Sequence, residues 1–131
     1  MKKLLGLGFL LLAAAGAQAA TVTLSWNYDY TGLALCSATA TVNCLDHFEM
    51  EDATSGTPAP IAAVANPANA SGKVTGISGT FQTSAFGTRV LAVTAVGRDG
   101  SGNFVSSDWT KCQGTFQITP SAPDGLAGTV Q

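Results

Sequence analysis

Short runs of alternating apolar and polar residues, separated by turn-forming residues, recur from residue 21 to residue 119 of this chain. Side chains of a β-strand alternate between its two faces, so residues 21–27 place Val22, Leu24 and Trp26 on one face. No amphipathic helical pattern accompanies these runs. Many short strands without helices predict an all-β fold, and a length of about one hundred residues favours an antiparallel β-sandwich.

A second run, residues 45–52, has the same period and is predicted to be a strand with one buried and one solvated face. Phe48 and Met50 share the face that we expect to be buried. The opposite, solvated face carries three charged or titratable side chains, which are His47, Glu49 and Glu51.

The clearest strand pattern is residues 88–96, which leads into a glycine-rich turn at residues 97–103. Asp-Gly and Gly-Asn pairs are typical of hairpin turns, so residues 110–119 are predicted to return antiparallel to this strand. Residues 74–84 are also predicted to be a strand, and the glycines at 76 and 79 within it predict a β-bulge.

The N-terminus has the order of a secretory signal peptide, because Lys2 and Lys3 precede an apolar run that ends in Ala17-Gln18-Ala19. This run is shorter than the roughly 20 residues of a membrane-spanning helix, and no later apolar stretch is longer. We therefore expect residues 1–19 to be removed, residues 20–119 to form one domain and residues 120–131 to form a tail. The mature chain is expected to be secreted, to the periplasm or the cell exterior, with no membrane span.

The net charge of the predicted mature chain restricts the kinds of partner that it is expected to bind. Lys2 and Lys3 are two of the six basic residues, so the predicted mature chain, with its eight acidic residues, has a net charge of −4. A mildly acidic domain without a basic cluster is not expected to bind nucleic acid.

Export permits disulfides, and the three cysteines allow one bridge in three ways. We favour Cys36 with Cys44, because they flank a short loop whose closure is worth about 2 to 3 kcal/mol. Cys112 is then either a buried small apolar residue or a free thiol, and burial is the ordinary state of such a residue.

The order of several short motifs resembles a fibronectin type III domain. In that family a strand reading Val-Thr-Leu-Ser-Trp ends in an inward Trp, as Val22 to Trp26 does here. Residues 46–50, the corner at 86–88 and the strand and turn at 93–103 follow in the family's order. The resemblance covers about residues 21–119 and implies an antiparallel Greek-key β-sandwich. Arg89 stands where the family usually has Tyr, so the family's hydroxyl-to-backbone tie is absent and a looser corner is expected.

The family begins with a strand A some ten residues before the Val-Thr-Leu-Ser-Trp strand, whereas cleavage after Ala19 leaves only two residues there. The resemblance therefore implies that strand A is missing. Residues 119–131 read like the start of a following domain, with Leu126 and Val130 on one strand face.

These two departures suggest that the tail donates a strand to another copy of the chain. We expect the last strand to run toward the pole opposite the start of the first strand, so that the tail continues into a second subunit. There Leu126 and Val130 would pair antiparallel with the acceptor edge formed by Val22, Leu24 and Trp26. A head-to-tail contact that does not close on itself gives a filament.

The energies of strand donation nearly cancel. Burying Leu126 and Val130 is worth about 3 to 5 kcal/mol and each ladder hydrogen bond about 1 kcal/mol, whereas ordering the tail costs about 1 to 2 kcal/mol per residue. Stable assembly therefore needs further contacts between the domain ends. A loose polar tail on a monomer is the alternative.

The chain offers little for catalysis. His47 is its single histidine, and a site formed with Asp46, Glu49 or Glu51 on an open strand face lacks the concave pocket that catalysis needs. No second cluster of Cys or His completes a zinc site. We expect no enzyme activity, cofactor or metal.

Two kinds of function follow. The first is a structural subunit that assembles head to tail outside the cell. The second is a monomeric module that binds a protein or a carbohydrate through the loops at 28–44 and 97–109. Tyr28, Tyr30 and Trp109 are candidate exposed aromatics for such binding, although we favour packing over the end of the sandwich as their role.

Overall fold

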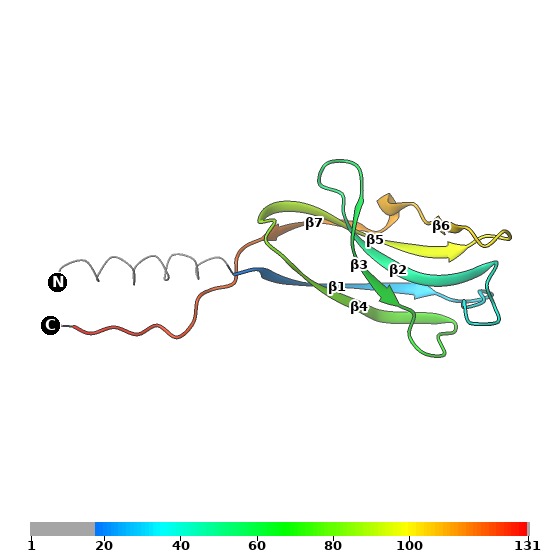
Figure 1. Cartoon of the computed structure of the whole chain (residues 1–131), viewed down its shortest axis with the longest axis horizontal. Helices are drawn as coiled ribbons and strands as arrows, with labels where there is room; N and C mark the ends of the chain where they lie inside the picture. The colour runs from blue at the N-terminus through cyan, green and yellow to red at the C-terminus, as the bar shows by residue number, and fades with distance from the viewer. Residues whose placement is uncertain (1–17, 131) are drawn as a thin grey trace, which may run out of the picture.

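The computed structural model describes residues 18–130, and the predicted signal peptide at residues 1–19 lies almost entirely outside this range. The described chain is an all-β sandwich of two antiparallel sheets (Figure 1). One sheet pairs β1 (Ala20–Asp29) with β4 (Lys73–Thr83). The other has the order β3 (Ala59–Ala65), β2 (Cys44–Asp52), β5 (Gly87–Arg98), and β5 pairs on its far side with β6 (Phe104–Ser106) and β7 (Gln113–Ile118).

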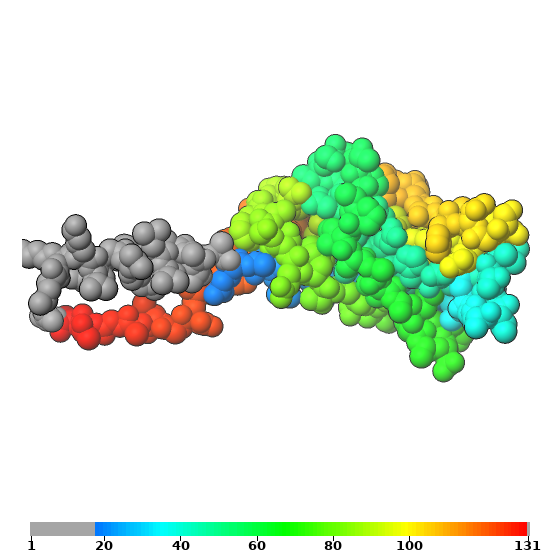
Figure 2. All heavy atoms as spheres, viewed as in Figure 1, coloured from blue at the N-terminus to red at the C-terminus, as the bar shows by residue number. Residues whose placement is uncertain are grey.

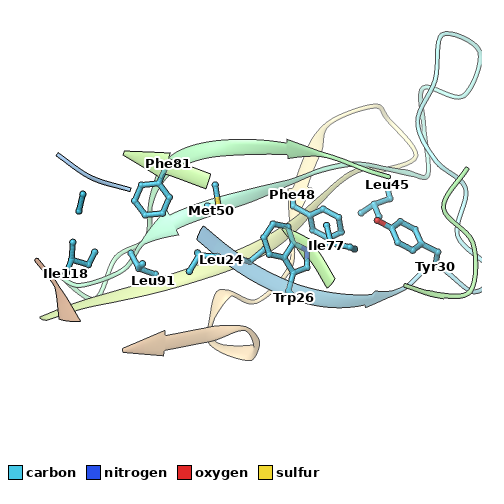
Figure 3. Close-up of a cluster of buried hydrophobic side chains, with 12 residues drawn as sticks. Leu24, Trp26, Tyr30, Leu45, Phe48, Met50, Ile77, Phe81, Leu91 and Ile118 are labelled. Carbon is cyan, nitrogen blue, oxygen red and sulfur yellow. The ribbon is translucent and has the colours of Figure 1, made fainter. Parts of the chain in front are cut away.

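The core lies between the sheets and is formed by the inward faces of their strands (Figure 3). The ring centroids of Trp26 in β1 and Phe48 in β2 lie 5.4 Å apart in an edge-to-face arrangement. At Gly79 in β4 the sheets approach closely, because a Cβ there would lie 2.5 Å from Cγ2 of Val64 in β3 and 2.9 Å from Sδ of Met50. The edge of the smaller sheet formed by β4 is thus packed against β3.

The main strand predictions are confirmed. Strands β1, β2, β4 and β5 cover the four predicted runs. The predicted bulge in β4 is present, since the β1–β4 register shifts between Trp26 and Tyr28 and Gly76 has a φ of 69°. The Gly76 backbone N–H donates a hydrogen bond of 3.1 Å to Oδ1 of Asn27, which fixes the bulge.

The antiparallel return after β5 starts earlier than residue 110. It begins at Phe104 with the short strand β6, and the connection to β7 contains a 3₁₀ turn, η1 (Trp109–Lys111). The turn before β6 is held by Asp99, whose Oδ1 accepts hydrogen bonds of 2.9 Å from the backbone N–H groups of Ser101 and Asn103. These hydrogen bonds hold the pKa of Asp99 below its usual value.

The favoured disulfide is confirmed, because Cys36 and Cys44 are bonded. The expectation that Cys112 is buried is wrong: it is a free, exposed thiol. Cys112 follows η1 at the outer margin of the larger sheet, and no strand of the described chain covers it there.

An ion pair between Arg89 and Asp52 holds the corner at Arg89. The Arg89 Nε donates a hydrogen bond of 3.0 Å to Oδ2 of Asp52 at the end of β2, and its Nη2 approaches the same oxygen to 2.5 Å. Burial raises the pKa of Asp52, but hydrogen bonds from Thr54 and the Arg89 guanidinium outweigh it and hold that pKa below its usual value. An ion pair thus connects β5 to β2 at the position where the resemblance implied a loose corner.

Both ends of the described chain leave the domain at the same pole, which corrects the expectation that the last strand runs away from the start of the first (Figure 1). Gly87 at the start of β5 pairs with Ile118 at the end of β7, and Ser121 Oγ donates a hydrogen bond of 3.0 Å to the backbone oxygen of Ala19. Beyond Ile118 the tail has no strand or helix and extends past the end of the domain (Figure 2). No helix among residues 18–130 is long and apolar enough to cross a membrane.

Candidate functional site

The free edge of β1 is the main irregularity of the sandwich. β1 bonds to β4 on one side, and within residues 18–130 no strand bonds to it on the other. Unpaired backbone N–H and C=O groups along such an edge can accept a further strand. The structure therefore leaves the expected acceptor edge, with Val22, Leu24 and Trp26, without a partner strand.

A groove lies between this edge and the inner faces of β5 and β7. It consists of two adjoining cavities that share Val93 and Cys112 in their walls. The larger, of about 230 Å³, reaches Trp26 and Phe48. The smaller, of about 120 Å³, is lined by residues that include Leu24, Leu91, Gly114 and Phe116. We call this continuous hollow the acceptor groove.

The acceptor groove is apolar and only partly covered. Phe116 in β7 pairs with Arg89 in β5 and lies on the inward side of the sheet. It nevertheless remains 41% exposed. Gly114 pairs with Leu91, and the Phe116 ring lies against it, since a Cβ at Gly114 would be 3.0 Å from Cζ of that ring. An additional strand along β1 would cover both positions, as burial of apolar surface favours.

Trp26 leaves an unsatisfied polar group beside the groove. The side chain is 6% exposed, and its Nε1–H has no hydrogen-bond acceptor among the described residues. A buried N–H without a partner costs about 1 to 3 kcal/mol.

The tail has two exposed apolar side chains of the kind that would fill such a groove. Leu126 and Val130 are fully exposed, and they contribute nothing to the core. The sequence places them four residues apart with Gly128 between them, so an extended tail presents all three on one face.

The three candidate ligand-binding aromatic residues near the loops are buried or half-buried. Tyr30 is 2% exposed, and its hydroxyl donates a hydrogen bond of 3.0 Å to Oδ1 of Asn66. It therefore packs inside the sandwich, as favoured above, and is not an exposed ligand-binding residue. Tyr28 is half-buried, with its ring centroid 5.1 Å from that of Phe48 and 5.0 Å from that of Tyr30. Trp109 is also half-buried.

The charged face of β2 is less solvated than the alternation predicts. Glu51 is 6% exposed and accepts a hydrogen bond of 2.6 Å from Oγ1 of Thr94, which is itself 2% exposed, so the prediction of a wet position is wrong there. His47 and Glu49 are half-buried. The period-2 pattern identified the correct face, but it contains no information about hydrogen-bond partners on the neighbouring strand.

His47 is held between two carboxylates. Its Nδ1 lies 2.9 Å from Oδ1 of Asp46 and its Nε2 lies 3.3 Å from Oε1 of Glu49. Arg98 Nε donates a hydrogen bond of 3.1 Å to the other oxygen of Asp46, and hydrogen bonds from His47 and Arg98 lower the pKa of that carboxyl group. Among the described residues no three His, Cys, Asp or Glu side chains are arranged to hold a metal ion. No hydroxyl or thiol in that part of the chain is hydrogen-bonded to His47 to serve as an activated nucleophile.

Sequence reasoning located one wall of the acceptor groove and missed the other. The missed residues are Leu91 and Val93 of β5 and Cys112, Gly114 and Phe116 in and before β7. The alternation of residues 112–118 was available as a signal, because every second residue there faces the groove or the core.

Comparison of the chain with protein-family models, with curated proteins and with solved structures gives no match.

Proposed function

We propose that this chain is an exported, non-enzymatic structural subunit that assembles when the C-terminal tail of one copy completes the sandwich of the next. The observation that carries the proposal is the open β1 edge above an apolar groove, together with a fully exposed Leu126 and Val130 in the same chain. Strand addition of this kind takes affinity from backbone hydrogen bonds and specificity from alternate side chains in pockets.

The proposal includes a fibronectin type III-like Greek-key fold without strand A. Immunoglobulin-like sandwiches place strands A, B and E in one sheet and strands C, F and G in the other. In that scheme β1 and β4 take the B and E positions, and β2, β5 and β7 take the C, F and G positions. The acceptor groove then corresponds to the place of strand A.

Export is supported by the order of charges and apolar residues before Ala19 and by the disulfide between Cys36 and Cys44. Disulfides persist in oxidising compartments and are rare in the cytosol. Removal of residues 1–19 would leave β1, which starts at Ala20, as the first segment of the mature chain.

Chain length favours another copy as the acceptor. The tail leaves the domain at the pole where β1 starts, so a tail that pairs antiparallel with β1 must enter from the opposite pole. The ten residues of β1 span about 33 Å, whereas the seven residues from Thr119 to Gly125 reach at most about 25 Å. Leu126 of the same copy therefore does not reach the far pole, from which an antiparallel strand would enter the groove.

Folding back onto the same domain would require a reversal at Pro120–Pro123 and a parallel pairing with β1. Proline-containing segments are extended and stiff, which disfavours a reversal there. A tail carried straight on instead reaches a second subunit and repeats the contact in an open series.

The alternative function, a monomer that binds a protein or carbohydrate through its end loops, loses support from the burial of Tyr30. The two functions differ in the effect of removing the tail. Purified residues 20–131 and 20–118 should be compared by sedimentation velocity, with thermal unfolding as the control for folding. The subunit function predicts concentration-dependent oligomers that disappear without the tail. A monomer at all concentrations in both forms would refute it.

A further inference from the structure

A third hollow, larger than either cavity of the acceptor groove, lies at the loop end of the sandwich. Its volume is about 330 Å³, and its walls include Tyr28, Leu33, Leu45, Arg98 and Val105. Leu33 and Val105 remain 48% and 50% exposed there. We call this hollow the pole pocket.

The pole pocket is continuous with the acceptor groove. Tyr28, Ala95 and Ser107 line both the pole pocket and the larger cavity of the groove. The three hollows therefore follow one line along the free edge of β1, from the loops toward Ala20. A strand that enters antiparallel to β1 passes the pole pocket first.

The alternation of side chains fixes a register for the incoming tail. The inward residues of β1 include Leu24, Trp26 and Tyr28, and the apolar face of the tail is Leu126, Gly128 and Val130. Leu126 opposite Tyr28 places Gly128 opposite the bulky Trp26 and Val130 beside the smaller cavity at Leu24. A shift by two residues would place Gly128, which has no side chain, opposite Leu24 and leave the smaller cavity unfilled.

We propose that the pole pocket binds residues 120–124 of the tail of a second copy, an inference that rests on the proposed strand donation. In the register above, the residues before Leu126 lie over the pole pocket. Pro120 and Pro123 are already extended and suit a pocket walled by an aromatic ring and aliphatic side chains.

The charged side chain in the wall of the pole pocket is already engaged elsewhere. Arg98 donates a hydrogen bond of 3.1 Å through Nε to Asp46, and its guanidinium carbon lies 4.4 Å from the ring centroid of Phe104. Neither Asp46 nor Phe104 lines the pocket. The half-exposed apolar side chains of the wall, Leu33 and Val105, are therefore the contacts that the pocket offers to the tail. They provide the additional contacts between domain ends that strand donation requires.

The test uses the full mature chain, residues 20–131, with the association constant measured by sedimentation velocity. Leu33→Ser should weaken association at least fivefold. Its matched control is Val42→Ser, because Val42 is 44% exposed on the same connection and does not line the pole pocket.

Leu126→Asp separates this inference from the function on which it rests. If Leu126→Asp prevents association while Leu33→Ser behaves like the wild type, the pole pocket has no role and strand donation stands. If Leu33→Ser and Val42→Ser weaken association equally, the specific role of the pocket is also overturned. If the wild type does not associate, both proposals fail.

Discussion

Replacing Leu126 by Asp should abolish assembly and leave the isolated domain unchanged. Leu126 is fully exposed and outside the core, so the substitution removes no contact from the subunit itself. On strand donation the same side chain becomes buried, which is worth about 1.5 to 3 kcal/mol for a leucine. A carboxylate in its place adds a desolvation cost of several kcal/mol. Loss of the apolar term alone lowers the association constant by roughly 10- to 100-fold, and the buried charge lowers it further.

The measurements are sedimentation velocity for association and denaturant unfolding for the stability of the domain. Thr129→Asp is the matched control, because it adds the same charge three residues away on the opposite face of an extended tail. We expect Thr129→Asp to associate nearly like the wild type and all three proteins to have the same unfolding midpoint once dissociated. Equal loss of association in both variants would mean that the face of the tail is irrelevant, and the reasoning from alternation would be refuted.

Three further predictions concern the domain. Replacing Cys36 and Cys44 together by Ala should lower the unfolding free energy by about 2.5 kcal/mol in a denaturant titration, the value expected for opening a loop with a sequence separation of 8; an unchanged midpoint would contradict this. Gly79→Val should cost about 1 to 3 kcal/mol in the same titration, because its Cβ would meet the opposite sheet. Asp52→Asn should be less stable than the wild type at pH 7, because the pKa of Asp52 is lowered in the folded state and its stabilisation is present above the unfolded pKa. That stabilisation is lost as the pH falls through the folded pKa, so the two stabilities should converge as the pH falls below about 4, the ordinary pKa of an Asp carboxyl; a constant difference would contradict the pKa shift.

The alternation of side chains was sufficient to predict the strands that form the core. The inward series of β1 and the β-rich run of β5 each followed from local period alone, and both strands lie where the sequence places them. The short loop between Cys36 and Cys44 likewise contained the information needed to pair them. In each case the relevant contact is set by residues close in sequence or by a repeating face.

The burial or exposure of several residues depends on partners far away in the sequence. Glu51 is buried because Thr94, which lies 43 residues later, donates a hydrogen bond to it from the neighbouring strand. Tyr30 is buried with its hydroxyl on Asn66, which lies 36 residues later. Cys112 is exposed because no strand lies along the free edge of β1 within the described chain. Local pattern contains none of this tertiary information.

In the candidate site, too, the features set by local sequence were predicted and those set by distant contacts were not. The acceptor edge and the apolar face of the tail were predicted from alternation, but the groove depth was not, because its far wall comes from β5 and β7. The relation between the chain ends also needed the structure, since both leave at one pole. That relation is what makes a second copy the better acceptor.

Strand donation is tested most directly by a cross-link between the tail and the acceptor groove. Cys112 is a free thiol in the wall shared by both groove cavities, and the proposed register places Gly128 between the two side chains that fill them. Mature Gly128→Cys, mildly oxidised at an assembling concentration, should give a ladder of dimers, trimers and longer species on a non-reducing gel. The ladder should disappear on reduction, with Cys112→Ser added, or with Thr129→Cys in place of Gly128→Cys. A protein that remains monomeric under these conditions, or cross-links equally well from position 129, would contradict donation of the tail to a second copy.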